Sequence, residues 1–173
     1  MRIIHCTKKL LKELGENPVD IAGIAADPGG LGNWYANIVR LDRKKCLLFT
    51  NEKTLYTFLV PKVMKADIRN IRQEFLNNLI FNLQHEGFSL EVISMVRDVY
   101  KEIGFAETAS RSVLGSMNEF SLQYEILMPE AGIEHIKILH LNHTINRVPM
   151  GAIKYDHPID RLKNLLQQNV SAI

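Results

Sequence analysis

Alternation of apolar and polar residues indicates β-structure in the first third of the chain. Residues 2–6 form a short apolar run, and residues 34–41 and 45–50 flank a turn at residues 42–44. Runs of this length bounded by turn residues predict strands, and the short turn predicts that the last two pair as a hairpin. Residues 54–60 are also rich in β-forming residues and end at Pro61, although Asn51 could equally cap a short helix there.

Helical periodicity dominates the rest of the chain. Thr7 and Gly15 bracket a short helix, as an N-cap and a C-terminal glycine do. A long helix is predicted from Asp67 to Glu86, and its apolar residues cover about half of its circumference, which indicates burial on two sides. Further helices are predicted from Ser89 to Ile103 with Gly104 as the stop, from Ser110 or Ser112 to Met128, from Ile133 to Asn146, and from Asp156 onward with Pro158 in the first turn.

The strands are thus concentrated before residue 61 and the helices after it, with residues 105–108 as one later candidate strand. This order predicts an α+β fold in which a small, mainly antiparallel sheet from the N-terminal third packs against a helical C-terminal two-thirds. The chain has 173 residues and no repeat, linker or low-complexity tract. That length is ordinary for one domain, so residues 1–173 are expected to form a single domain.

Composition predicts the cellular compartment in which the protein works. The chain is 46% hydrophobic and 23% charged, which argues against disorder. No apolar run approaches the roughly 20 residues of a membrane span, and the N-terminus lacks the apolar stretch of a signal peptide. Cys6 and Cys46 lie in apolar, strand-like segments, which favours buried free thiols over a disulfide. We therefore expect a cytoplasmic protein that does not associate with membranes.

Charge is the most suggestive feature. The net charge is only +2, yet residues 1–72 carry +6 and residues 73–173 carry −4. The basic residues fall into three groups: Arg40, Arg43, Lys44 and Lys45 around the predicted hairpin; Lys62, Lys65, Arg69 and Arg72 near the start of the long helix; and Lys8, Lys9 and Lys12 in the first helix. Such an asymmetry indicates an anionic partner, either nucleic acid or an acidic protein surface. Ordinary solvated surface is the alternative.

Candidate chemistry is sparse. His140 and His143 share a helix face with His135 nearby, which is a weak signal for a metal, but no carboxylate stands at ligand spacing and no metal or cofactor motif is present. A glycine loop at residues 27–32 offers backbone amides without the ending of a phosphate-binding loop. His5 and Lys8 are weak candidates for an acid or base beside that loop. Arg72, inside the apolar stripe of the long helix, is expected either to extend to solvent or to pair with a buried carboxylate.

Several segments resemble an uncharacterised family of small bacterial proteins that carries a domain-of-unknown-function label. They are residues 5–11, Trp34–Asn37, Lys45–Asn51 with Thr54 and Leu55, Ser112–Asn118, and Leu141 to Met150. The resemblance spans nearly the whole chain and implies a bacterial cytoplasmic protein, but no activity, cofactor or catalytic residue. The polar residues in or beside these segments cap backbone ends or line a polar pocket; they are Thr7, Lys8, Asn37, Asn51, Thr54, Asn118, Asn142 and Asn146.

Two function classes remain open from the sequence. The first is a binding or regulatory module that contacts an anionic partner, nucleic acid before acidic protein, through the basic N-terminal half. The second is a small-molecule enzyme whose polar pocket lies near the glycine loop and uses His5 or Lys8. The sequence does not indicate an oligomeric state.

Overall fold

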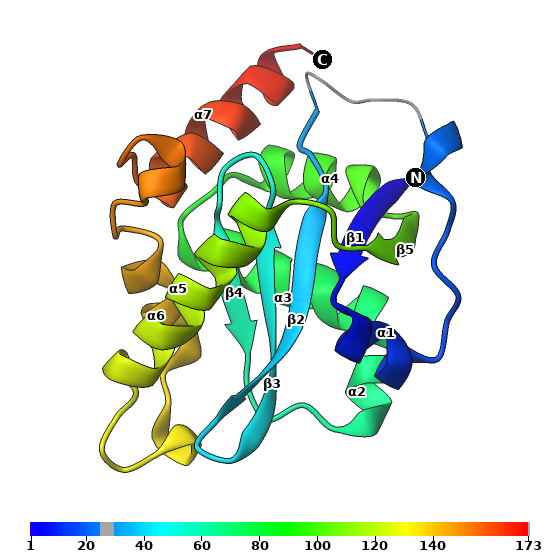
Figure 1. Ribbon diagram of the computed structural model, residues 1–173. Coiled ribbons are helices and arrows are strands. Elements are labelled where there is room, and N and C mark those ends of the chain that lie inside the picture. Colours follow the sequence, from blue (N-terminus) through cyan, green and yellow to red (C-terminus); the bar gives the residue numbers. More distant parts are fainter. Residues whose placement is uncertain (25–29, 173) are drawn as a thin grey trace.

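The computed structural model describes residues 1–24 and 30–172, which contain a mixed five-stranded sheet (Figure 1). The strand order is β4-β3-β2-β1-β5, where the strands are β1 Arg2–Cys6, β2 Trp34–Leu41, β3 Lys44–Asn51, β4 Thr57–Val60 and β5 Ile103–Glu107. Strands β2, β3 and β4 form an antiparallel meander, whereas β1 is parallel to both β2 and β5. The predicted α+β class is confirmed, and the parallel pairings make the sheet mixed.

Helices cover both faces of this sheet (Figure 1). One face carries α1 Lys8–Leu14, α2 Lys65–Arg69, α3 Ile71–His85, α4 Leu90–Val99 and α7 Pro158–Ser171. The other face carries α5 Arg111–Leu127 and α6 Ile138–Ile145. None of the helices in the described part combines the length and apolar character that a membrane-spanning segment requires.

Strand alternation explains the two cores. Along β2, Trp34 and Ala36 face the first core, and Tyr35 and Val39 face the second, as the predicted period of two requires. Cys6 and Cys46 belong to different cores and are both buried and free. The sheet therefore separates the two thiols, which confirms the expectation of unpaired cysteines.

The predicted long helix from residue 67 to residue 86 is two helices. Asn70 has φ −102° and ψ 29°, ends α2 and precedes α3, so the chain bends there. The predicted stop at Gly104 is also wrong, because α4 ends at Val99 and Gly104 lies inside β5, paired with Ile3 of β1. In both places the apolar periodicity of the sequence predicts a continuous helix. Tertiary contacts, namely helix packing around Asn70 and sheet pairing at Gly104, override that local preference.

The hairpin between β2 and β3 has a two-residue turn. Asp42 and Arg43 both have positive φ, 46° and 62°, which is the geometry of a type I′ turn. This turn twists with the strands, so it fixes the register in which Leu41 faces Lys44 and Arg40 faces Lys45. The aspartate carboxylate also accepts a hydrogen bond from the backbone N–H of Ile133 at 3.0 Å, which ties the turn to the segment before α6.

Hydrogen bonds from other segments of the chain reach both edges of the sheet. At the β4 edge, the α6 residues Asn142 and Asn146 bond the strand as another strand would: their Oδ1 atoms accept from Leu59 N–H and Thr57 N–H, and the Asn146 amide donates to the Thr57 carbonyl. At the β5 edge, Arg72 Nε donates to the Ile103 carbonyl, and the Val19 N–H donates to the Phe105 carbonyl. Covering the edge strands in this way is one of the means by which proteins limit strand pairing with other chains.

Arg72 extends to solvent and does not pair with a buried carboxylate: its side chain is 46% exposed, and its partner Glu16 is 39% exposed. Its guanidinium makes two 2.7 Å contacts with Glu16 and lies 4.3 Å from the centroid of the Phe105 ring. The hydrogen bond from Arg72 lowers the pKa of the Glu16 carboxyl. A carboxyl whose folded-state pKa is lowered stabilises the fold above its unfolded pKa, and this stabilisation is lost as the pH falls through the folded pKa.

Glu16→Gln is therefore expected to lower the free energy of unfolding at neutral pH and to flatten its decline on acidification through the acid range of carboxyl titration. Arg72→Met should flatten the same part of the curve, and the double variant should add little to either single change. Urea unfolding at a series of pH values measures this. A wild-type pH dependence in both single variants would contradict it. The effect is expected to be small, because both side chains are partly exposed.

Candidate anion-binding site

Cationic side chains from three separate parts of the chain line one surface hollow of about 670 Å³. They are Lys9 and Lys12 of α1, Lys45 of β3, and Lys65 and Arg69 of α2. Glu13, Leu14 and Gly15 at the end of α1 complete the wall. We call this feature the basic hollow. It unites members of all three basic groups that the sequence singled out.

Short helical spacing explains how each helix presents its charges. In α1, Lys9, Lys12 and Glu13 stand three and four residues apart on one side, while Leu10 and Leu14 are buried on the other. In α2, Lys65 and Arg69 are four residues apart, and the intervening Ile68 is buried. Helix α1 packs against α2, so the two charged sides border the same space (Figure 1).

Lys45 occupies the inner part of the basic hollow. It is half-buried, whereas the other four cations are exposed. Its Nζ lies 2.7 Å from Glu13 Oε2, and its backbone carbonyl accepts a hydrogen bond from Val63 N–H at 2.9 Å. Arg40 is its register partner on β2, so the two side chains lie on the same face of the hairpin. The hollow thus sets five cations against one carboxylate among its lining residues.

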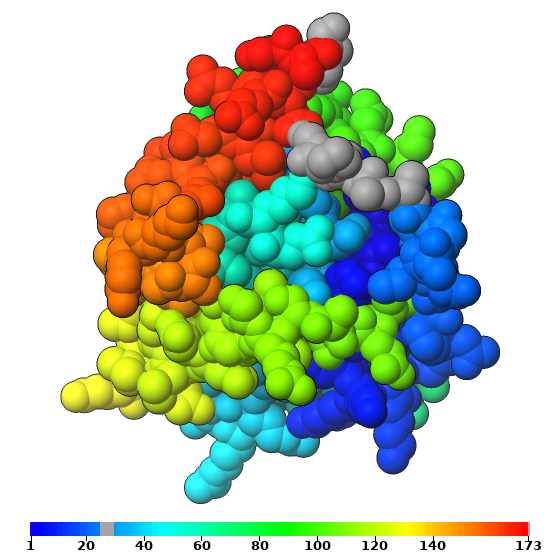
Figure 2. Space-filling view, turned by 45° about the horizontal axis from the view of Figure 1, so that its top comes forward, coloured from blue at the N-terminus to red at the C-terminus, as the bar shows by residue number. Residues whose placement is uncertain are grey.

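The other predicted anion-binding residues lie outside the lining of the hollow. Arg43 and Lys44 are exposed at the tip of the hairpin, the light blue segment that projects from the lower edge of the molecule in Figure 2. Lys62 follows β4 and pairs with Glu134 at 3.1 Å. Arg40 is exposed beside Lys45. Of the predicted residues, the hollow therefore includes Lys45, Lys65 and Arg69. Lys9, Lys12 and Glu13 of α1 also line it, whereas the hairpin tip does not.

His5 and Lys8 have different environments. His5 is 6% exposed and stacks on Tyr35, with ring centroids 4.8 Å apart. Its Nδ1 lies 2.8 Å from the carbonyl oxygen of Glu107, and because that carbonyl can only accept, Nδ1 donates the proton. Lys8 is exposed at the start of α1. The neighbouring Cys6 thiol is fully buried, and burial raises its pKa to about 12, so it is a poor nucleophile.

The polar residues that the family segments share hold loops and edges in place. Asn51 accepts hydrogen bonds from the backbone N–H groups of Lys53 and Thr54, and donates to the carbonyl of Leu31. The hydroxyl of Thr7 donates to Asn37 Oδ1 at 2.9 Å. Asn142 and Asn146 cover the β4 edge as described above. The contacts of Asn51, Asn142 and Asn146 are the backbone-capping role that the sequence left open beside a polar pocket, whereas Thr7 and Asn37 bond each other through their side chains.

The histidines of α6 lie beside an ion pair between Glu86 and Arg147. The rings of His140 and His143 are 6.4 Å apart between centroids, and His143 Nδ1 lies 3.1 Å from a carboxylate oxygen of Glu86. That carboxylate is 1% exposed and makes two contacts with the guanidinium of Arg147, the shorter at 2.7 Å. Among the described residues, no group of three or more His, Cys, Asp or Glu side chains is placed to hold a metal ion.

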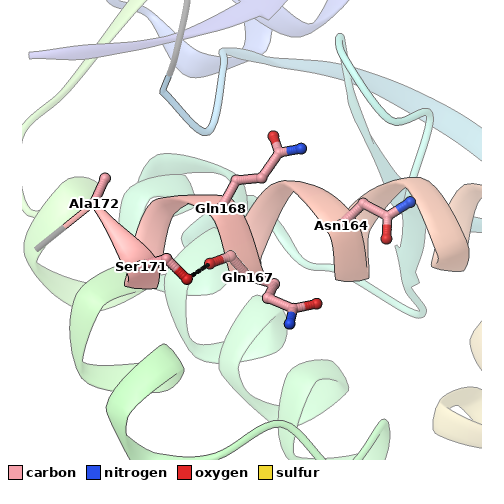
Figure 3. A pocket seen from close by; sticks show the side chains of 5 residues that line it. All are labelled: Asn164, Gln167, Gln168, Ser171 and Ala172. Carbon is pink, nitrogen blue, oxygen red and sulfur yellow. Dashed lines mark hydrogen bonds between the residues drawn. The ribbon is translucent and has the colours of Figure 1, made fainter.

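Two other features carry less chemistry. Residues 27–29 of the glycine loop lie outside the described residues. A hollow of about 390 Å³ runs along α7, where Figure 3 shows amide and hydroxyl side chains from that one helix. Its lining residues are Asn164, Gln167, Gln168, Ser171 and Ala172. None of these five is charged, so this hollow lacks the charge complementarity of the basic hollow.

Comparison with protein families gives a match that covers most of the chain. A family model described as "Domain of unknown function (DUF6933)" matches residues 3–161. The chain belongs to this family. The matched range includes every residue that lines the basic hollow and both asparagines at the β4 edge. The comparisons with curated proteins and with solved structures found no match.

Proposed function

We propose that the protein binds an anionic partner in the basic hollow, and that this partner is a nucleic acid contacted through its phosphates. The observation that carries the proposal is the convergence of five cations from α1, β3 and α2 on one concave surface. Folding has gathered charges that are far apart in the sequence, although like charges repel each other when they are brought together.

The chemistry of the lining favours phosphate contacts over base recognition. Lysine and arginine side chains neutralise phosphates without requiring a particular base, so they position a nucleic acid rather than read its sequence. None of the residues that line the basic hollow is aromatic, and stacking on aromatic rings is what single-strand binders add to charge. We therefore infer salt-sensitive binding with little sequence preference.

The location proposed for this activity is the cytoplasm. Both cysteines are buried, free and on opposite faces of the sheet, which suits a compartment that keeps thiols reduced.

The test is a salt titration of binding to single- and double-stranded DNA and RNA, starting at low ionic strength. A hollow variant carrying Lys12→Ala, Lys65→Ala and Arg69→Ala is expected to bind more weakly. The slope of log affinity against log salt should fall by about 2–3 if all three cations contact phosphates. A tip variant carrying Arg43→Ala and Lys44→Ala measures how much the cations at the hairpin tip contribute to binding, apart from those of the basic hollow.

The matched control removes the same charge elsewhere. Lys137, Lys154 and Lys163 are exposed and lie outside the lining of the basic hollow. Lys163 belongs to α7, and Lys137 and Lys154 belong to the segments before α6 and α7. Their triple alanine variant should lose much less affinity and keep the wild-type slope. The proposal fails if the wild type binds no nucleic acid at low salt, or if both triple variants weaken binding equally. Binding of poly-glutamate without binding of nucleic acid would instead make an acidic protein surface the partner.

A further inference from the structure

The basic hollow contains its own negative charge. Glu13 is the one carboxylate among the described residues that line it, and its Oε2 lies 2.7 Å from Lys45 Nζ. The two side chains are 27% and 33% exposed, so the ion pair is partly shielded from water. The four remaining cations, Lys9, Lys12, Lys65 and Arg69, are exposed around it.

A phosphate is therefore bound less readily at Lys45, in the inner part of the hollow, than at the four outer cations. A phosphate oxygen that approaches Lys45 must share Nζ with the Glu13 carboxylate oxygen already bound there or replace it, and it is repelled by the Glu13 charge. A phosphate at the outer cations meets neither obstacle. Because like charges a few ångströms apart repel strongly where water is partly excluded, the inner position is disfavoured for an isolated phosphate.

We propose that Glu13 is a built-in counter-ion that restricts the hollow to partners presenting several phosphates at once. A chain of phosphates can engage the outer cations together and gains affinity from each of them. Inorganic phosphate or a mononucleotide has too few charges to do so and is denied the enclosed position at Lys45. This inference rests on the proposed function, since it concerns which phosphate-bearing partners the same hollow accepts.

The alternative role of Glu13 is to hold Lys45 in a position that is productive for binding. The two roles predict opposite effects for Glu13→Gln, which keeps the shape of the side chain and removes its charge. If Glu13 is a counter-ion, the substitution frees Lys45 for a phosphate. If Glu13 positions Lys45, the substitution lets the lysine move and weakens binding.

The experiment measures binding of a fluorescent oligonucleotide at several salt concentrations, with inorganic phosphate and a mononucleotide as competitors. For Glu13→Gln we expect about five- to tenfold tighter oligonucleotide binding at low salt. The salt slope should steepen by about 0.7–0.9, the value of one additional phosphate contact. Phosphate and mononucleotide should also compete at lower concentrations than they do against the wild type.

Two further variants make the result specific. Glu16→Gln removes the same charge three residues away, outside the lining of the hollow, where Glu16 pairs with Arg72 and not with Lys45. At physiological salt, where charges are screened within about 8 Å, it should shift affinity less than Glu13→Gln does. The double variant Glu13→Gln with Lys45→Gln should lose the additional slope, because the freed cation is absent.

Failure of this inference can be told apart from failure of the proposed function. If neither wild type nor Glu13→Gln binds oligonucleotide at low salt, the proposed function itself is wrong. If the wild type binds and Glu13→Gln binds equally or more weakly, Glu13 is not a counter-ion. An equal gain from Glu16→Gln would also overturn the inference, since the effect would then follow net charge alone.

Discussion

Asn142→Ala is expected to lower the free energy of unfolding by about 3–5 kcal/mol, because the substitution strands three buried groups. Asn142 is fully buried. Its Oδ1 accepts from the Leu59 N–H at 3.1 Å and from the Tyr124 hydroxyl at 2.6 Å, and its amide donates to Asn82 Oδ1 at 2.9 Å. Each partner lies where water does not replace the lost bond without opening the structure.

Urea unfolding of the variant and the wild type measures this loss, provided that the two transitions have equal m-values. Asn118→Ala is the matched control, because it makes the same chemical change at an exposed position of α5. The control should change the free energy of unfolding by no more than about 0.5 kcal/mol. A loss below about 1 kcal/mol for Asn142→Ala would mean that these hydrogen bonds contribute little to stability.

Phe75→Ala is expected to be comparably destabilising, by about 3–5 kcal/mol, through a cavity in the first core. Phe75 of α3 is fully buried, and its ring centroid lies between 5.2 and 6.0 Å from those of Trp34, Phe49, Phe58 and Tyr100. Its ring therefore joins the helix to three strands and to the end of α4. Alanine would leave these four rings without their common neighbour.

Thermal unfolding is a suitable measurement, since such a loss corresponds to a fall in Tm of about 6–20 °C for a domain of this size. Phe81→Ala is the control within the same helix, because that side chain is 55% exposed. Its effect should stay within about 0.5 kcal/mol. Equal effects from the two substitutions would show that the aromatic cluster does not contribute more than helix packing in general.

Local signals in the sequence predicted the elements well. Gly15 ends α1 with φ 73°, and Ser89 and Ser110 accept hydrogen bonds from the backbone at the starts of α4 and α5. Caps of this kind depend on residues within one helical turn, so the sequence contains them completely. The predicted helix from Ile133 to Asn146 was only partly right, because α6 begins at Ile138 after a separate turn at Ile133–His135.

Contacts between distant residues set the limit of prediction. The parallel pairing of β1 with β5 joins residues about one hundred positions apart, and nothing in either segment specifies the partner. The same holds for the candidate site. The spacing of Lys9, Lys12 and Glu13 on α1 is visible in the sequence, but their position beside Lys45 depends on a contact across 32 residues. The hairpin tip looked equally basic, yet its turn carries Arg43 beyond the hollow.

Because α6 covers the edge of β4, that edge stays unpaired during synthesis until α6 has been made. Thr57 and Asn146 are 89 residues apart, so the asparagine leaves the ribosome after the whole β2–β4 meander has been made. At about 5–20 residues per second, the edge of β4 waits roughly 4–18 s for its partner. During that interval a nascent chain has an unpaired strand next to an apolar face. Slower translation lengthens this interval and with it the exposure of the unpaired edge to other chains.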